Sequence, residues 1–181
     1  MSEKELTNRC RQNDNIARRE LYELYAGQML SICCRYVGDR ELAQDLLHDG
    51  FLKIYRSFDK FAYRGEGSLR AWMSKVMVNI SLEFLRKREA VNGTIALDEL
   101  PDTMVDESVE ELSIVPQSVL MKFIEELPQG YRTVFNLFVL DEKSHKEIAE
   151  LLGINEKSSA SQLFRAKSVL AKKIKDYLDK Q

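Results

Sequence analysis

Short polar side chains are concentrated between Glu156 and Gln162, in the C-terminal part of the chain. Such side chains suit a hydrophobic core poorly, but their donors and acceptors match those that DNA bases display in the major groove. Leu163, Ala166 and Leu170 follow at helical spacing and would bury the opposite side of the same helix. The pattern therefore predicts a helix that packs on one side and can contact base edges on the other.

The residues just before this helix predict a partner helix that would position it. Ser144 and Glu147 have the spacing of a capping box, which starts a helix, and Gly153 stands where a helix commonly ends in a left-handed turn. The second helix is expected to begin near Asn155. The inner face of the first would consist of Ile148, Ala149 and Leu152. Two short helices joined by a glycine turn have the outline of a helix-turn-helix.

An ordinary helix pair would also explain these features, and one residue departs from the helix-turn-helix pattern. An ordinary antiparallel helix pair in a bundle can show the same caps and the same glycine turn. Ser159 occupies a position where a helix-turn-helix usually has an apolar residue. We therefore expect the second helix to be anchored mainly by Leu163 and Phe164.

The composition indicates an all-α protein. Of 181 residues, 44% are hydrophobic and 31% are charged, with only 3 prolines and 8 glycines, as in helix-rich globular proteins. No run approaches the roughly 20 apolar residues needed to cross a bilayer, and the polar start MSEKELTNRC lacks the apolar core of a signal peptide. We therefore expect a cytoplasmic location.

The three cysteines are expected to be buried, reduced thiols. Cys10, Cys33 and Cys34 are odd in number, and their spacing fits neither a disulfide framework nor a zinc site. Free cysteine mostly behaves as a small hydrophobe, and a redox-sensing Cys33 and Cys34 pair is the alternative. His48 and His145 are too few and too isolated for a ligand cluster, so we expect no metal or other cofactor.

Charge is segregated along the chain, although the formal net charge is only -2. Residues 1–92 hold 16 basic and 13 acidic side chains, and residues 119–181 hold 11 and 9. Residues 93–118 hold none that are basic and 7 that are acidic. Two mildly basic ends can bind phosphate locally despite the acidic segment between them.

Apolar periodicity predicts two helical domains on either side of that acidic segment. Two further C-terminal helices are expected, one over about residues 119–126 and one over TVFNLFVL. We predict a helical domain over residues 1–90, a flexible acidic linker over 91–118 with no sustained period, and a helix-turn-helix domain over 119–181. The N-terminal apolar stripes comprise Leu21, Leu24, Tyr25, Met29, Ile32 and Tyr36; Leu42, Leu46, Leu47, Phe51, Ile54 and Phe58; and Leu69, Trp72, Met73, Val76, Ile80 and Phe84.

The chain shows no catalytic motif, so the candidate sites are surfaces. It has no glycine-rich phosphate loop, nucleophile elbow or metalloprotease ligand pair, and we expect neither enzymatic activity nor a small-molecule substrate. Asp45 and Asp49 lie one helical turn apart, beside Gln44 and His48. Like charges at this spacing cost a helix about 0.2 to 0.5 kcal/mol and favour a basic partner. A plain solvated face is the alternative.

A second surface combines basic and aromatic residues. Basic groups pair with phosphates and aromatic rings stack on unpaired bases, so this combination predicts binding of single-stranded nucleic acid. Trp72 falls within an apolar stripe and is expected in the core. The surface contains Lys60, Phe61, Tyr63, Arg64, Arg70, Lys75, Arg86, Lys87 and Arg88.

These features, in this order, resemble those of bacterial sigma factors of the extracytoplasmic function group, within the sigma-70 family. The resemblance covers essentially the whole chain, through ELAQDLLHDGFLKIYRSFDKF, GSLRAWMSKVMVNISLEFLRKR and ELPQGYRTVFNLFVLDEKSHKEIAELLGINEKSSASQLFRAK. It implies a promoter-specificity subunit that makes no bonds itself. Its implied partners are core RNA polymerase, promoter DNA and an anti-sigma factor. The acidic segment would thread through basic channels of the polymerase.

The resemblance also assigns roles by position. It places the pocket for a flipped minus-ten base at residues 61–68, and such a pocket helps offset the few kcal/mol that unpairing costs. Ala160 and Gln162 stand where lysine or arginine is frequent, which implies altered sequence preference and a weaker electrostatic grip. Core polymerase binding falls to Gln44, Asp45, His48 and Asp49; the minus-ten element to Lys60, Phe61, Tyr63, Arg64, Arg70, Lys75 and Asn79; and the minus-thirty-five element to Lys157, Ser158, Ser161, Gln162, Arg165 and Lys167. Among these polymerase-binding residues, Gln44 and His48 depart from the family's pattern of acidic residues and glutamine, whereas Asp45 and Asp49 fit it.

Two other classes of protein fit parts of the pattern. A free-standing helix-turn-helix regulator could use its N-terminal bundle to sense a ligand or a partner. A purely structural helical adaptor would need neither Arg165 nor Lys75 for any DNA interaction.

Overall fold

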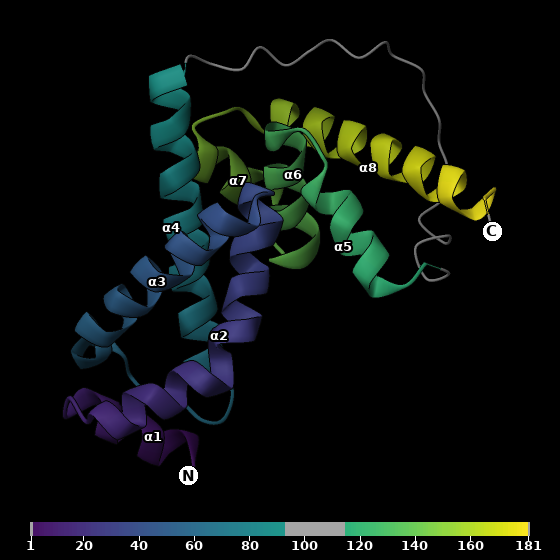
Figure 1. Cartoon of the computed structure of the whole chain (residues 1–181). Coiled ribbons are helices and arrows are strands. Elements are labelled where there is room, and N and C mark those ends of the chain that lie inside the picture. Colours follow the sequence, from purple (N-terminus) through teal and green to yellow (C-terminus); the bar gives the residue numbers. More distant parts are fainter. Residues whose placement is uncertain (1, 93–114, 181) are drawn as a thin grey trace. The chain divides into compact units, whose positions relative to one another are not determined.

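The computed structural model describes residues 2–92 and 115–180, and every regular element among them is helical (Figure 1). The chain divides into two compact units, Met1–Thr94 and Ile95–Gln181. The all-α expectation is therefore confirmed. The last N-terminal helix extends to Asn92 and the next begins at Gln117, so both ends of the predicted linker lie in helices. Its central residues, 93–114, fall outside the described part.

The first unit is a bundle in which α2 packs against both α3 and α4. It contains α1 (Glu3–Arg11), α2 (Asn15–Val37), α3 (Arg40–Arg56), a 3-10 turn η1 (Phe58–Lys60) and α4 (Ser68–Asn92). Local sequence sets the helix ends. The Asp14 carboxylate accepts from the amides that start α2, Gly38 ends it at φ 68°, and Asp39 caps α3. Three of these helices match the predicted stripes, whereas α1 was not predicted.

The core of the first unit follows those stripes with one clear exception. Leu24 belongs to the stripe of α2 but is 62% exposed, because only part of that stripe faces α3 and α4. Gly50 faces Met77 where α3 packs against α4, and a Cβ there would stand 2.3 Å from Met77 Sδ, so the flexible Met77 side chain would have to move. The buried stripe residues are Leu21, Met29, Ile32, Tyr36, Leu46, Leu47, Phe51, Ile54, Phe58, Leu69, Met73 and Ile80.

All three cysteines are free thiols, but Cys34 is half-buried rather than buried as predicted. Cys10 and Cys33 are buried, and burial raises the pKa of each to about 11. Since the thiolate is the reactive form, a raised pKa makes both thiols unreactive near neutral pH. The two residues therefore act as small core side chains.

The second unit is built around one long helix. It contains α5 (Gln117–Glu125), α6 (Gln129–Phe135), a π-helical turn η3 (Asn136–Leu140), α7 (His145–Leu152) and α8 (Glu156–Leu178). α8 packs against α5, α6 and α7. Buried Arg132 donates from Nη1 to the carbonyls of Glu125, at 2.7 Å, and Leu127, at 3.0 Å, which satisfies the end of α5.

Candidate functional site

α3 presents Gln44, Asp45, His48 and Asp49 on its exposed side. The buried side of the same helix carries Leu46, Leu47 and Phe51. Within residues 2–92 and 115–180, no cation forms an ion pair with either aspartate. The predicted polymerase-binding set therefore forms one exposed face with unneutralised negative charge.

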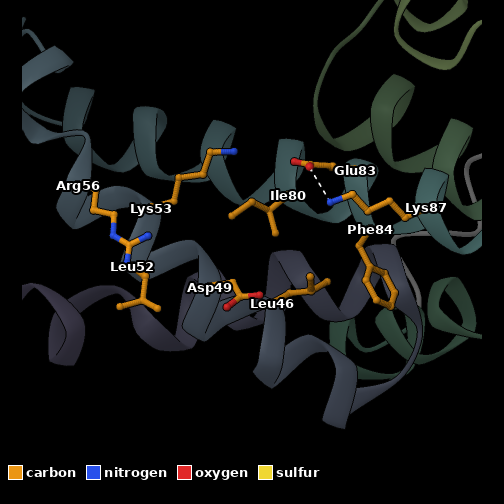
Figure 2. Close-up of a pocket in the computed structure, with 9 residues that line it drawn as sticks. All are labelled: Leu46, Asp49, Leu52, Lys53, Arg56, Ile80, Glu83, Phe84 and Lys87. Atoms are coloured by element: carbon orange, nitrogen blue, oxygen red, sulfur yellow. Dashed lines mark ion pairs between the residues drawn. The ribbon is translucent and has the colours of Figure 1, made fainter.

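Asp49 also lines a groove between α3 and α4 that the sequence did not reveal (Figure 2). The groove has a volume of about 400 Å³. On α4, Lys87 Nζ lies 3.0 Å from a carboxylate oxygen of Glu83, and this hydrogen bond lowers the pKa of Glu83. Besides Asp49, the lining comprises Leu46, Leu52, Ile80 and Phe84, which are apolar, and Lys53, Arg56, Glu83 and Lys87, which are charged.

The segment between η1 and α4 holds much of the predicted minus-ten set. Gly65 and Gly67 have φ values of 120° and 83°, which L side chains rarely adopt, so these glycines shape the segment. Ser68 Oγ donates to the Gly65 carbonyl at 2.6 Å and accepts from the Arg64 amide at 3.2 Å. Lys60 and Arg64 are exposed, and Tyr63 is half-buried.

The structure places Phe61 and Trp72 differently from the prediction. Phe61 is only 7% exposed, and its ring stacks on Trp72 with centroids 4.8 Å apart. Trp72 also meets Phe58 edge-on at 5.4 Å, yet it is half-buried rather than fully in the core. The exposed part of the Trp72 ring, rather than Phe61, is therefore the aromatic surface at this place.

The predicted contacts on α4 do not form one row. Lys75 and Asn79 are exposed, lie one turn apart and share the side of α4 that carries Trp72. Arg70 is exposed about half a turn around the helix from Asn79. Its charge partly offsets the rise in the pKa of Tyr25 that burial causes, so Arg70 lies toward α2.

α1 holds the segment between η1 and α4 at both ends. The Glu3 carboxylate accepts from the amides of Gly67 and Leu69, each at 2.8 Å. Arg11 donates from Nη2 to the Phe61 carbonyl at 2.7 Å and from Nε to the Phe58 carbonyl at 3.3 Å. Periodicity cannot reveal such contacts, and only the Ser2 cap and the short stripe of α1 hint at a helix there.

In the second unit, α7 and α8 form the predicted helix-turn-helix. Ser144 and Glu147 make both hydrogen bonds of the capping box, at 3.2 and 2.8 Å. Gly153 ends α7 at φ 68°, and the Asn155 side chain accepts from the Ser158 amide at 2.7 Å to start α8. The predicted caps and the glycine turn are therefore confirmed.

Most of the predicted minus-thirty-five set lines one cavity of about 310 Å³. The cavity lies beside α8, and Tyr131 of α6 contributes to its wall. Lys167 is exposed but does not line it. The predicted residues that the cavity brings together are Lys157, Ser158, Ser161, Gln162 and Arg165.

The anchoring of α8 corrects the expectation for Phe164. Leu163 is 6% exposed and belongs to the core, but Phe164 is 44% exposed because it lies one residue further around the helix. Ser159 is fully buried, and its Oγ lies 2.9 Å from Nδ1 of His145. The His145 ring in turn stacks on Phe138 with centroids 4.5 Å apart. His145 thus provides the polar partner that a buried serine needs.

Residues 2–92 and 115–180 contain no group of three histidine, cysteine, aspartate or glutamate side chains placed to hold a metal ion. They also contain no helix that is long and apolar enough to cross a membrane.

Comparisons with known proteins match both units. Residues 21–91 match the family model for sigma-70 region 2, and residues 117–170 match the model for sigma-70 region 4. The RNA polymerase sigma-E factor of Streptomyces avermitilis is 30% identical over 132 residues, which are 73% of this chain and 70% of that protein. The ECF RNA polymerase sigma factor SigM of Bacillus subtilis is 26% identical over 153 residues, or 83% and 91% of the two chains.

A solved structure has a similar fold. The sigma factor RpoE of Bartonella quintana, in complex with the anti-sigma factor NepR, superposes with a TM-score of 0.51 at 16% sequence identity. The match covers 87% of this chain and 96% of that one. At this identity the likeness concerns the fold alone.

Proposed function

This chain belongs to the sigma-70 family, as a sigma factor of the extracytoplasmic function group, and we propose which of its surfaces bind polymerase and which bind promoter DNA. As a sigma factor, it is a transcription initiation factor that directs RNA polymerase to specific promoters and supports their opening. One observation supports separate roles for the two units: the two family regions match in order, each within its own helical unit.

Residues 1–90 act as the region 2 domain, residues 119–181 act as the region 4 domain, and the acidic residues 91–118 join them. The chain works by binding, so it catalyses no reaction itself and takes no small-molecule substrate. Its partners are core RNA polymerase and promoter DNA, which place it in the cytoplasm.

The acidic face of α3 binds core polymerase. Asp45 and Asp49 are exposed and have no ion-pair partner in the described part of the chain, so a basic partner gains attraction without first breaking an internal pair. Gln44 and His48 add hydrogen-bonding groups on the same side. The groove that Asp49 lines offers Leu52 and Phe84 as apolar contacts beside the charges.

The minus-ten element is bound as a single strand along the segment before α4 and along α4 itself. The partly exposed Trp72 ring, with Lys75 and Asn79 beside it, combines a stacking surface with polar groups. Lys60 and Arg64 would contact phosphates, Tyr63 would contact a base, and Arg70 would act at the start of α4. Phe61 contributes by supporting Trp72.

The minus-thirty-five element is bound as duplex by α8. Lys157, Ser158, Ser161, Gln162 and Arg165 are grouped around one cavity, which supports a shared role in one groove of DNA. Lys167 contacts phosphate further along the helix. With few basic residues among them, these contacts are weak alone, which suits a subunit that binds promoters only when held by polymerase.

An anti-sigma factor regulates the protein by covering these surfaces. Support comes from the RpoE structure, whose fold is similar and which contains the anti-sigma factor NepR. A partner that covered α3 or α8 would block polymerase or DNA.

Binding to core polymerase tests this function. The full chain, mixed with purified core polymerase, should form one stable complex that initiates transcription from genomic promoter fragments. Asp45→Lys should weaken this binding by about tenfold, because charge reversal replaces attraction by repulsion, with an unchanged helical spectrum. Glu5→Lys makes the same charge change at an exposed position of α1 and should retain wild-type affinity.

Two results would contradict parts of this account. If the wild-type chain bound duplex DNA but not core polymerase, it would be a free-standing regulator. If Asp45→Lys bound core polymerase as tightly as the wild type, the acidic face of α3 would lose its assignment.

A further inference from the structure

α1 is joined to the segment before α4 by two charged side chains, one at each end. Glu3 accepts two backbone amides, those of Gly67 and Leu69, at 2.8 Å each. Arg11 donates to two backbone carbonyls, those of Phe58 and Phe61. All four bonds involve a charged group, and such bonds are stronger than bonds between neutral groups.

Glu3 serves as a helix cap supplied from a distant part of the chain. The first amides of a helix have no acceptor within it, and a negative charge at that end is favourable. The Glu3 carboxylate meets both needs at the first turn of α4, although it lies 64 and 66 residues earlier in the sequence. It thereby caps the start of α4.

Arg11 acts at the opposite end and reaches the aromatic surface indirectly. It fixes the Phe61 carbonyl at 2.7 Å, and the Phe61 ring stacks beneath Trp72 at 4.8 Å. A shift of the Phe61 backbone would therefore move Trp72. The contacts connect α1 to the ring that lies beside Lys75 and Asn79.

α1 can hold this segment because it is itself fixed. Leu6, Thr7 and Cys10 are buried on its inner face, so the core determines where Glu3 and Arg11 lie. Within the segment, Ser68 Oγ bonds the Gly65 carbonyl and the Arg64 amide. Gly65 and Gly67 have no side chain to restrict their backbone, so the bonds from Glu3 and Arg11 add fixation from outside the segment.

We propose that Glu3 and Arg11 are positioning residues for minus-ten recognition, which hold residues 61–69 and Trp72 in the strand-accepting geometry before DNA arrives. The inference rests on the minus-ten role proposed above for that segment. A segment ordered in advance loses less conformational entropy on binding, so its fixation raises affinity. A fixed segment also cannot repack around a mismatched base, so its fixation raises base preference as well.

The experiment uses holoenzyme made from the full chain and core polymerase. It transcribes a pool of promoter fragments in which the minus-ten and minus-thirty-five regions are randomised, and sequencing of the transcribed templates gives the base preference at each position. Glu3→Gln keeps the size of the side chain but replaces one acceptor oxygen by an amide group that cannot accept. It should reduce the minus-ten preference by up to about tenfold, the limit reached if the free energy of one lost hydrogen bond to a charged group appeared fully in base discrimination, and leave the minus-thirty-five preference unchanged.

A matched control and a second variant make the result specific. Glu5→Gln makes the same chemical change at an exposed side chain in the same turn of α1 and should alter neither preference. Arg11→Lys keeps the charge but cannot bond both carbonyls in the same way, so it should reduce the minus-ten preference alone. A variant that is merely less stable lowers the amount of active holoenzyme without changing base preference. If Glu3→Gln failed to fold, Arg11→Lys would decide.

The possible results separate this inference from the function on which it rests. Wild-type minus-ten preference in both Glu3→Gln and Arg11→Lys would overturn the inference and leave the minus-ten role intact. If the wild-type holoenzyme showed no minus-ten preference, the proposed minus-ten role would fail, and the inference with it.

Discussion

Ser159 is a buried hydroxyl at a position where an apolar side chain would be expected. Its Oγ meets His145 Nδ1 at 2.9 Å, and Phe138 covers the His145 ring. The pair joins the first residue of α7 to the second turn of α8. A buried polar group that has a partner adds specificity to packing, whereas one without a partner destabilises.

Ser159→Ala should therefore lower the free energy of unfolding by about 1 kcal/mol, because the His145 ring loses its partner. Ser161→Ala is the control, since it makes the same change at an exposed position of α8. It measures what alanine itself adds through its higher helix propensity, and this variant should not be destabilised. Urea unfolding of both variants gives the comparison. Equal stability of the two would show that the hydrogen bond contributes nothing.

The structure places the rings of Phe164 and Phe61 differently from the prediction, because the direction in which a side chain points depends on the local backbone. Phe164 is apolar and was expected in the core, but Ser159, Leu163 and Ala166 share the buried side of α8 and Phe164 does not. Phe61 was expected to face DNA, but the chain turns at η1 and buries its ring against Trp72. The spacing of apolar residues identifies the buried face of a helix well, but it predicts the geometry of loops poorly.

The capping box of Ser144 and Glu147 starts α7. The hydrogen bonds from Ser144 to the Glu147 carboxylate lower the pKa of that carboxyl below its ordinary value of 4.5. A lowered folded-state pKa means that the ionised form stabilises the folded state above the ordinary pKa. This contribution is lost as pH falls through the lower, folded-state pKa.

Glu147→Gln should consequently remove part of the acid sensitivity of the protein. The difference in unfolding free energy between about pH 7 and about pH 3 should be smaller in Glu147→Gln than in the wild type. Glu150→Gln, an exposed carboxylate on the same helix, should leave the difference unchanged. A wild-type pH dependence in Glu147→Gln would remove this role from the capping box.

Elements with local signals could be predicted, and elements held by distant contacts could not. α2, α3, α4, α7 and α8 each combine an apolar period with a cap or a glycine stop. α1 is short and mostly polar, and its anchoring depends on residues that lie far along the chain. For the same reason the groove between α3 and α4 appeared only in the structure.

Under the proposed function, the two units each bind DNA weakly and act together. The formal net charge is -2, and each end of the chain carries only a small basic excess, so neither unit has a strong electrostatic hold on DNA. Two weak contacts on one DNA molecule reinforce each other once both are attached to polymerase. We therefore expect that weak single contacts keep the free protein off promoters.

Footprinting of a promoter that the holoenzyme transcribes tests whether the two units bind separate DNA segments. The wild-type holoenzyme should protect two separate segments and open the DNA at the downstream one. Lys75→Ala should reduce opening while upstream protection persists, and Arg165→Ala should reduce upstream protection, each by about tenfold in affinity. A single protected segment that forms equally well without core polymerase would contradict the account.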